Sequence, residues 1–295
     1  MPIKTRATEF FHTLQDEITL ALETLDGGAI FREDEWNRPE GGGGRSKVMV
    51  EGNVFEKAGV NFSAVHGESP KMLQSNMKDP SQFYATGVSL VLHPRSPKIP
   101  TIHANFRYLE QSTGETWFGG GMDLTPYYLV EEDAVHFHRT IKTTCDRHDP
   151  NYYPRFKKWC DEYFYIKHRA ETRGIGGIFF DHLAGNEAEF EKIFSFVQDI
   201  GRTFLSSYMP IVELHRNETY TQLEREWQLL RHGRYVEFNL VYDKGTLFGL
   251  ETRGRIESIL MSLPTLARWD YDMIPARGSE EEKLVSVLQN PRDWV

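Results

Sequence analysis

The short connections between successive strand-like segments constrain the fold of this chain more than any other feature. Two segments with strand character span residues 87–93 and 100–110, and a third begins at Trp117 and Phe118. A parallel crossover needs about a dozen residues or more, usually in a helix, and these connections are shorter than that. Neighbouring strands are therefore expected to run antiparallel. The third strand is expected to end where the glycines of 119–121 begin.

A second pair of strands is expected near the C-terminus. Residues 235–242 and 246–252 are joined by Asp243-Lys244-Gly245, and this pattern predicts a β-hairpin. A shorter strand is expected at 47–50, after a polar segment that ends in the glycine-rich run 41–46. Because these glycines precede a strand and do not open a helix, they do not match a phosphate-binding P-loop.

Helical periodicity marks the segments around these strands. Residues 8–25 place Phe10, Leu14, Ile18 and Leu22 on one stripe, and Asp26-Gly27-Gly28 is expected to end this helix. With no internal repeat or linker, residues 1–295 are predicted to form one α+β domain in which helices pack on a largely antiparallel sheet. The other expected helices span residues 131–145, 155–172, 187–208, 219–231 and 280–288.

Composition restricts the partners and the compartment. The chain has 295 residues, with 34 basic and 43 acidic side chains and a formal charge of -9, which disfavours nucleic acid and anionic membrane surfaces as partners. No run of about 18 apolar residues occurs, so no integral membrane segment is expected. The two cysteines, Cys145 and Cys160, form no CxxC pair, which indicates a reducing compartment, with the cytoplasm as the expected one.

Polar side chains alternate along two of the expected strands. Because successive side chains point to opposite faces, His103, Asn105 and Arg107 share one face of their strand. Ser89 and His93 share a face of the preceding strand for the same reason. The two rows could line one cleft, or they could form the solvated outer face of an antiparallel sheet.

Residues 153–181 carry the densest mixture of aromatic, cationic and glycine residues in the chain. Glycines cost order and buried cations need partners, so packing alone rarely explains such a mixture. It indicates an anionic or flat ligand nearby. Asp123 is expected on a constrained loop after three glycines, either as a ligand-contacting residue or as a turn or helix-cap aspartate. Arg253 and Arg255, on either side of Gly254, could bind carboxylates or lie in a surface turn.

The histidines give only weak support for a metal-binding site. Imidazoles beside a carboxylate suit iron, zinc or manganese, but no HExxH spacing occurs, and scattered histidines are more often hydrogen-bonded structural residues. His136 and His138 lie two apart on an expected helix, so at most one of them is expected to be functional. Cys160 has no evident histidine partner and is not expected to be a catalytic thiolate. The candidate ligands are His93, His103, His138 and His168.

Several segments, taken together, resemble the oxygen-dependent coproporphyrinogen III oxidase family nearly from end to end. The long run from Lys158 to Asp181 is the most specific of these segments. The others lie at residues 41–46, 59–63, 87–90, 103–107, 119–126, 233–240 and 257–262.

This resemblance implies a large antiparallel sheet covered by helices on both sides, assembled as a homodimer. It implies an oxidoreductase of haem (porphyrin) biosynthesis that converts two propionate groups of coproporphyrinogen III to vinyl groups, giving protoporphyrinogen IX, carbon dioxide and hydrogen peroxide. Dioxygen is the co-substrate, no organic cofactor is implied, and a divalent metal is compatible with the family but not required. The oxygen-independent enzyme needs several cysteine ligands for an iron–sulfur cluster, more than this chain supplies.

The resemblance also implies residue roles. Asp123 would accept hydrogen bonds from pyrrole N–H groups and favour loss of a proton, Arg107 would hold the reacting propionate, and His103 would donate a proton. The substrate-binding positions would be Ser89, Asn105, Phe106, Arg107, Gly254 and Arg255. The metal positions proposed for bacterial members would be His93, His103, His138 and His168.

Two positions depart from the family pattern. Arg253 stands where some relatives have glycine, and His182 stands where many have a second acidic residue, so neither is assigned a role. Two other functions remain open. A metal-dependent oxygenase or hydrolase would use the histidines and lose activity on chelation. A tetrapyrrole carrier would keep the arginines but would need neither Asp123 nor dioxygen.

Overall fold

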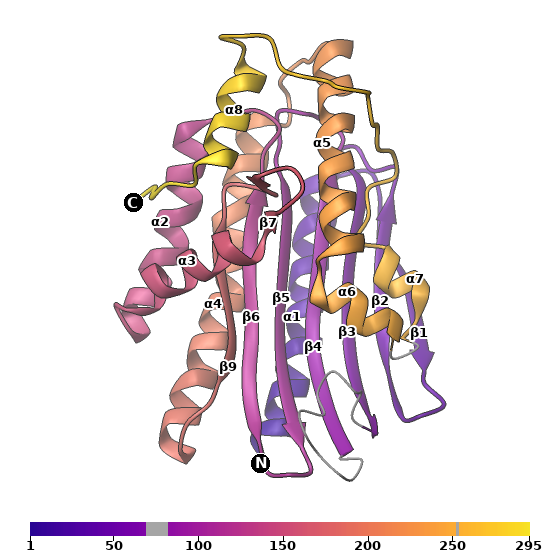
Figure 1. Cartoon of the computed structure of the whole chain (residues 1–295). Helices are drawn as coiled ribbons and strands as arrows, with labels where there is room; N and C mark the ends of the chain where they lie inside the picture. Colours follow the sequence, from indigo (N-terminus) through magenta and orange to yellow (C-terminus); the bar gives the residue numbers. More distant parts are fainter. Residues whose placement is uncertain (69–81, 252–253) are drawn as a thin grey trace.

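A seven-stranded antiparallel sheet forms the centre of the computed structural model, which describes residues 1–68, 82–251 and 254–295 (Figure 1). The strand order is β1-β2-β3-β4-β5-β6-β9, and β7 and β8 form a separate two-stranded sheet. The strands are β1 (Arg32–Asn37), β2 (Gly42–Val50), β3 (Phe55–Glu68), β4 (Gln82–Pro94), β5 (Thr101–Gln111), β6 (Thr116–Thr125), β7 (Tyr165–Ile166), β8 (Glu171–Thr172) and β9 (Gly177–Leu183).

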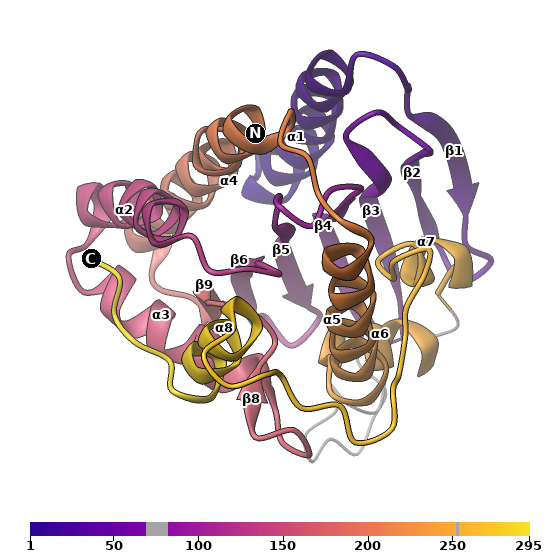
Figure 2. The same cartoon turned by 90° about the horizontal axis from the view of Figure 1, so that it is seen from above.

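Helices cover both faces of this sheet, with α1 and α4 on one face and α5 and α6 on the other, as Figure 2 shows. The α+β class and the antiparallel sheet expected from the sequence are confirmed. Within the described ranges, no helix has the length and apolar character needed to cross a membrane. The helices are α1 (Ile3–Asp26), α2 (Glu131–His148), α3 (Tyr152–Tyr163), α4 (Glu187–His215), α5 (Gln222–Val241), α6 (Lys244–Glu251), α7 (Ile256–Leu260) and α8 (Glu280–Gln289).

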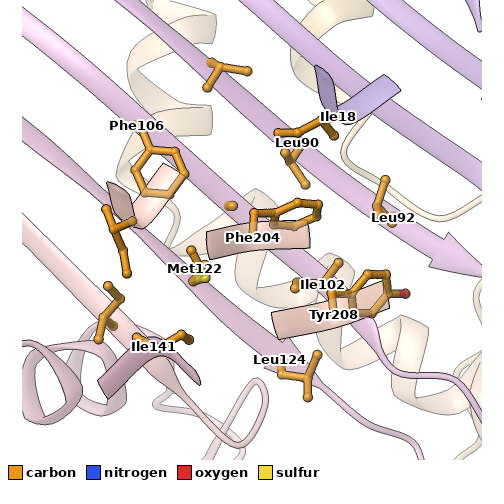
Figure 3. Packing of buried hydrophobic residues seen from close by; sticks show 14 of the residues in the cluster. Ile18, Leu90, Leu92, Ile102, Phe106, Met122, Leu124, Ile141, Phe204 and Tyr208 are labelled. Carbon is orange, nitrogen blue, oxygen red and sulfur yellow. The ribbon is translucent and has the colours of Figure 1, made fainter. Parts of the chain in front are cut away.

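The face of the sheet toward α1 and α4 carries the main apolar core. It packs against Ile18 of α1 and against Phe204 and Tyr208 of α4 (Figure 3). Burying one such side chain contributes about 1.5–3 kcal/mol, so this layer fixes which face of each strand remains for polar residues. Alternate residues of β4, β5 and β6 supply the sheet side of this core, each at most 1 % exposed: Leu90, Leu92, Ile102, Phe106, Met122 and Leu124.

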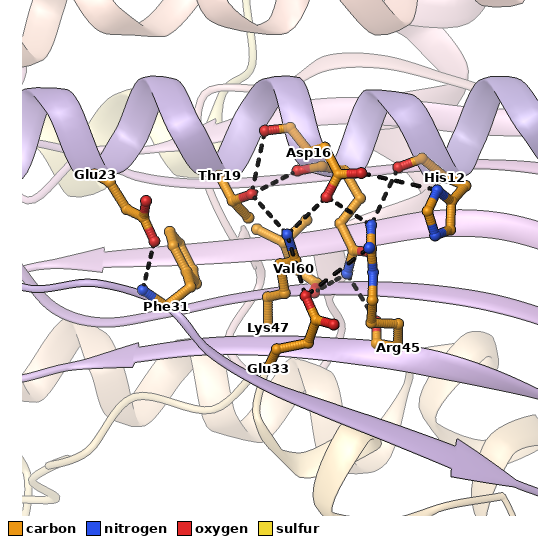
Figure 4. Close-up of polar contacts among 10 residues, drawn as sticks. His12, Asp16, Thr19, Glu23, Phe31, Glu33, Arg45, Lys47 and Val60 are labelled. Atoms are coloured by element: carbon orange, nitrogen blue, oxygen red, sulfur yellow. Dashed lines mark hydrogen bonds and ion pairs between the residues drawn. The ribbon is translucent and has the colours of Figure 1, made fainter.

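Charged side chains join the edge of the sheet to α1 (Figure 4). Asp16 of α1 accepts hydrogen bonds from Arg45 and Lys47 of β2, each at 2.7 Å. Glu33 of β1 lies 3.5 Å from the same lysine. Burial alone would raise the pKa of Asp16, but the hydrogen bonds from Lys47 and Arg45 lower it below its ordinary value. The helix that packs on the centre of the sheet therefore also holds its edge.

The β-hairpin expected within residues 235–252 is wrong, because this region is helical in α5 and α6. A capping box between Thr221 and Glu224 starts α5, and the helix then continues past the expected end at residue 231. Residue 252 lies outside the described residues. The aromatic run fits a helix as well as a strand, since its buried members recur at helical spacing: Tyr235, Phe238 and Asn239.

The helix expected at 155–172 ends earlier, at Tyr163 of α3. The chain then forms the short strands β7 and β8, and Ala170 between them has a φ of 53°, a left-handed conformation that interrupts a helix. Phe164 and Ile166 are buried in a small second cluster with Cys160 and Phe238. The segment that follows Tyr163 therefore packs in space between α3, which contributes Cys160, and α5, which contributes Phe238.

Strand β6 continues through the three glycines and ends at Thr125. Gly119, Gly120 and Gly121 pair in register with β5. Asp123 therefore stands on a strand and not, as expected, on a loop. The polar segment before residue 47 also belongs to the sheet, because β1 and the first half of β2 form there.

Candidate active site

Polar side chains of β3 to β6 share the face of the sheet opposite the apolar core, and we call this surface the polar face. Ser89 pairs in register with Asn105, and His103 pairs with Asp123. The rows expected from two separate strands therefore lie side by side. Ser89 is exposed, and His103, Asn105 and Arg107 are partly exposed, so solvent reaches the middle of this surface. The polar face comprises Asn61, Ser89, His103, Asn105, Arg107 and Asp123.

A chain of hydrogen bonds runs along β5 from Arg107 to Asp123. Arg107 donates from Nη1 to Asn105 Oδ1 at 2.8 Å. Asn105 Nδ2 lies 3.4 Å from His103 Nε2, and His103 Nδ1 lies 2.8 Å from Asp123 Oδ1. An arginine can only donate and a carboxylate can only accept. Asn105 Nδ2 is therefore the donor to His103 Nε2, and His103 carries its hydrogen on Nδ1.

Asp123 is the buried end of this chain, with 1 % of its surface exposed. Arg173 Nη2 contacts both carboxylate oxygens at 2.9 Å. Burial alone would raise the pKa of Asp123, but the Arg173 guanidinium and His103 lower it below its ordinary value. The carboxylate is therefore charged. The His103 side chain, 17 % exposed, lies between it and the open part of the polar face.

The sequence did not predict Arg173 as a site residue, although it lies in the aromatic and cationic segment 153–181. It is 2 % exposed, and its Nη1 donates to Asn239 at 2.7 Å. Its guanidinium lies over the rings of Phe164, Tyr235 and Phe238, at 4.2, 4.5 and 4.9 Å from their centres. These rings exclude water and keep the cation fixed against Asp123. The sequence pattern that could have indicated a buried arginine is its position directly before Gly174 and the glycine-rich apolar run 175–180.

Arg107 is the exposed end of the chain, with 32 % of its side chain accessible. Asp181 of β9 lies 2.9 Å from its Nη2. A carboxylate of the protein itself is therefore paired with this guanidinium. The neighbouring His182 stacks on Trp117, with ring centres 4.8 Å apart.

Arg255 lies at the opposite end of the polar face, where its guanidinium pairs with Asp34 of β1. Four strand spacings separate β1 from β5, a distance of about 19 Å. Arg255 and Arg107 therefore lie at the two ends of a row of polar side chains, which Ser258 of α7 covers at Ser46. Gly254 directly precedes Arg255, whereas Arg253 lies outside the described residues. One transverse row of register partners joins the two ends: Asp34, Ser46, Asn61, Ser89 and Asn105.

The four histidines considered as metal ligands do not come together. In the part of the chain that the structure describes, no group of three or more His, Cys, Asp or Glu side chains is arranged to hold a metal ion. Burial lowers the pKa of His93, and it lowers that of His138 to about 3, so both rings are neutral. His103 is bonded to Asp123 and Asn105, as described above. The other three histidines have hydrogen-bond partners elsewhere: His93 with Thr101 and Ser262, His138 with Tyr153 and Ile175, and His168 with Tyr242 and Glu237.

Phe106, expected among the substrate-binding residues, lies on the opposite face of the sheet. Its side chain is fully buried in the apolar core (Figure 3). It stands between Asn105 and Arg107 in the sequence, so the alternation of the strand directs it away from them. The Phe106 side chain therefore does not line the polar face, and the assignment of Phe106 to substrate binding stays a prediction.

Comparison with known proteins identifies the family of this chain. Residues 6–294 match the family model described as coproporphyrinogen III oxidase. The chain belongs to the coproporphyrinogen III oxidase family. It is 55 % identical to the oxygen-dependent coproporphyrinogen-III oxidase of Drosophila melanogaster, with 96 % of this chain and 76 % of that protein covered. The expected family is thereby confirmed.

Plant and human relatives are similar over nearly the whole chain. Identity to the chloroplastic coproporphyrinogen-III oxidase 1 of Arabidopsis thaliana is 50 %, covering 99 % of this chain and 80 % of the relative. Identity to the mitochondrial oxygen-dependent coproporphyrinogen-III oxidase of Homo sapiens is 52 %, covering 99 % of this chain and 67 % of the relative.

Proposed function

We propose that this chain is an oxygen-dependent oxidase that converts coproporphyrinogen III to protoporphyrinogen IX in haem biosynthesis. Each of two propionate groups loses its carboxyl group as carbon dioxide and becomes a vinyl group. Each conversion passes two electrons to dioxygen, which leaves as hydrogen peroxide. The observation that carries the proposal is the hydrogen-bonded chain from Arg107 to Asp123 on the polar face of a member of this family.

Arg107 binds the propionate that reacts. Its guanidinium fork matches a carboxylate, and its partial exposure lets a ligand reach it. A carboxylate held in place keeps the adjacent carbon–carbon bond in a fixed orientation until that bond breaks. Arg107 stands beside Asn105 on the same strand, so the anchor and the proton-exchanging groups share one rigid support.

His103 and Asp123 act on the centre of the macrocycle. Pyrrole N–H groups are donors, and His103 Nε2, which accepts from the Asn105 amide in the unliganded site, can accept from a pyrrole N–H in its place. Removing a pyrrole proton makes the ring electron-rich enough to react with dioxygen, and the buried Asp123 stabilises the charge that the imidazole gains. Direct contact between Asp123 and the pyrrole N–H groups requires the His103 side chain to turn aside.

The other carboxylates of the substrate lie toward Arg255. Arg255 and Gly254 stand at the β1 side of the polar face, and Ser89 and Asn105 lie between the two arginines. Both guanidiniums are already paired with carboxylates, Arg255 with Asp34 and Arg107 with Asp181. This arrangement suits a flat ligand with anionic groups on its rim.

Aerobic turnover of coproporphyrinogen III by the purified chain tests the proposal. The reaction is run with and without a chelator, and the product is followed by protoporphyrin fluorescence after oxidation. Turnover that the chelator leaves unchanged supports the proposal, in which the substrate supplies the electrons and no organic cofactor takes part. Turnover that is lost on chelation and restored by one metal would favour a metal-dependent oxygenase. Binding without turnover would favour a tetrapyrrole carrier.

A homodimer completes the proposal, because large apolar side chains are exposed on α5 to α7 and on the segment that follows. Leu240→Asp combined with Ile256→Asp should shift a dimer to monomer in sedimentation, because burying a charge opposes association. Leu214→Asp, at an exposed leucine of α4, is the matched control. An unchanged dimer in the double variant would exclude this surface. The exposed residues are Leu240, Val241, Leu250, Ile256, Leu266, Trp269, Tyr271 and Ile274.

The proposed compartment is the cytoplasm. Cys145 and Cys160 are both free and buried, which is usual where thiols stay reduced. The human and plant relatives carry names that place them in mitochondria and chloroplasts. Cell fractionation with an antibody against the chain distinguishes these compartments.

A further inference from the structure

A β-bulge lies where β9 passes the exposed end of the hydrogen-bonded chain. Phe180 pairs with Gly120 and Leu183 pairs with Phe118, so the two residues between them oppose Gly119 alone. These two residues are Asp181 and His182, and His182 has a φ of 50°. A non-glycine residue in this left-handed conformation is uncommon, and bulges often direct a side chain beside an active site.

The bulge and the missing side chain of Gly119 bring Asp181 and Arg107 together. Gly119 is the register partner of Arg107. A Cβ atom at Gly119 would lie 2.4 Å from Asp181 Oδ1 and 2.9 Å from Arg107 Nε. Both side chains therefore cross the space that a larger residue would occupy. The backbone N–H of His182 donates to Asp181 Oδ1 at 3.0 Å, while Oδ2 faces Arg107 Nη2 at 2.9 Å.

Unlike the ion pair at Asp123, this pair is accessible. The side chains of Arg107 and Asp181 are 32 % and 24 % exposed, whereas those of Arg173 and Asp123 are 2 % and 1 % exposed. A dissolved carboxylate can therefore compete for Arg107 but not for Arg173. An exposed pair is also weak, so exchanging one carboxylate for another costs little.

We propose that Asp181 is an internal substitute for the substrate carboxylate. It holds Arg107 extended across Gly119 in the unliganded protein, yields the guanidinium to an incoming propionate, and pairs with it again when that carboxylate has left as carbon dioxide. The inference rests on the proposed role of Arg107 as the propionate-binding residue. It assigns a positioning role to Asp181, which acts on the substrate only through Arg107.

This exchange has a consequence for a substrate that reacts twice. A guanidinium with no internal partner would hold every carboxylate of the macrocycle more tightly, including those of the partly converted intermediate. Competition from Asp181 weakens each of these contacts equally. The intermediate can then leave Arg107 and present its second propionate. Asp181 therefore lowers the affinity of Arg107 for each substrate carboxylate, and this lower affinity allows the intermediate to rebind to Arg107 through its second propionate.

Asp181→Asn tests the inference, because asparagine keeps the shape and removes the charge. The probe is coproporphyrin III, an unreactive tetracarboxylate, titrated by fluorescence. The variant should bind it about fivefold more tightly than the native chain, which is the strength of a good exposed ion pair. The KM for coproporphyrinogen III should fall without a rise in kcat. Asp181→Glu should return both values toward native ones, and His182→Asn, which suits a left-handed residue, is the matched control.

Two results separate this inference from the role of Arg107. Arg107→Ala should weaken binding, and adding Asp181→Asn to it should change nothing further, because the competitor then has no target. If Arg107→Ala binds and turns over like the native chain, the proposed role of Arg107 fails. If Arg107→Ala is impaired but Asp181→Asn binds equally or more weakly than the native chain, only the exchange is overturned.

Discussion

Replacing Arg173 by methionine should leave Asp123 as a buried carboxylate without its cation. Methionine fills most of the same space between Phe164 and Tyr235 but cannot donate to the carboxylate oxygens. Asp123 is 1 % exposed, so water cannot replace the two lost contacts at 2.9 Å. Removing one partner of a buried pair costs about 3–5 kcal/mol, and we expect Arg173→Met to lower the free energy of unfolding by that amount.

A double variant gives the reference for this value. Arg173→Met with Asp123→Asn removes both charges, and asparagine can still accept the hydrogen bond from His103. Without a stranded charge, we expect the double variant to lose only about 1–2 kcal/mol, the cost of the altered hydrogen bonds. It should therefore be more stable than Arg173→Met alone, although it carries one more substitution. It should remain inactive, since the buried carboxylate is gone.

Urea unfolding followed by tryptophan fluorescence measures all three proteins, with the slopes compared to verify that the same surface is exposed. A loss below about 1 kcal/mol in Arg173→Met would refute the reasoning, because such a value is typical of an exposed pair. So would a double variant that is less stable than the single one. The same logic applies to Asp123→Ala, which removes the carboxylate partner of the buried Arg173, so the turnover of this variant should be measured together with its free energy of unfolding.

The remaining predictions concern the exposed arginine and a carboxylate outside the site. Arg107→Ala should lower kcat/KM about 100-fold with little loss of stability, because the substrate loses its alignment. Arg95→Ala, which removes an exposed guanidinium paired with Glu51 at 3.2 Å, should leave turnover unchanged, and equal losses in both would contradict the assignment. Burial alone would raise the pKa of Glu237, but hydrogen bonds from Arg169, His168 and Trp269 lower it to about 2. Its folded-state value is depressed, so its contribution to stability is present above pH 4.5, the ordinary value, and is lost as the pH falls toward 2. The difference in unfolding free energy between the native chain and Glu237→Gln should shrink over that range, and a difference independent of pH would exclude the effect.

The sequence predicted β4, β5, the start of β6 and their antiparallel pairing because these rules are local, whereas β1, β3 and β9 were not predicted as strands. A short connection forces two strands to be antiparallel, and alternation alone placed His103, Asn105 and Arg107 on one face. The same alternation directs the Phe106 side chain to the opposite, apolar face. Long-range pairs were harder to predict. Arg173 and Asp123 are 50 residues apart in the chain, and no local period connects them.

The wrong hairpin has a similar cause. The residues from Tyr235 onward fit two periods at once, and only the start of the segment distinguishes them. Thr221 and Glu224 form a capping box, a signal that favours a helix, and Gly233 alone weakens the helical pattern before residue 235. Gly233 in the middle of this helix is explained only by the fold, because a Cβ there would lie 2.6 Å from the carbonyl oxygen of Arg268.

The direction of the hydrogen bonds along β5 sets an order of events at His103. Arg107 fixes the orientation of the Asn105 amide, and this amide in turn occupies His103 Nε2 with a donor. The imidazole therefore begins each cycle with no proton to give from that nitrogen. Before it can act as an acid, it must first act as a base toward the ligand. A proton that His103 later donates is then one that it took from the substrate itself. Converting a propionate carboxylate and dioxygen to a vinyl group, carbon dioxide and hydrogen peroxide consumes one proton, so solvent must supply one proton in each conversion.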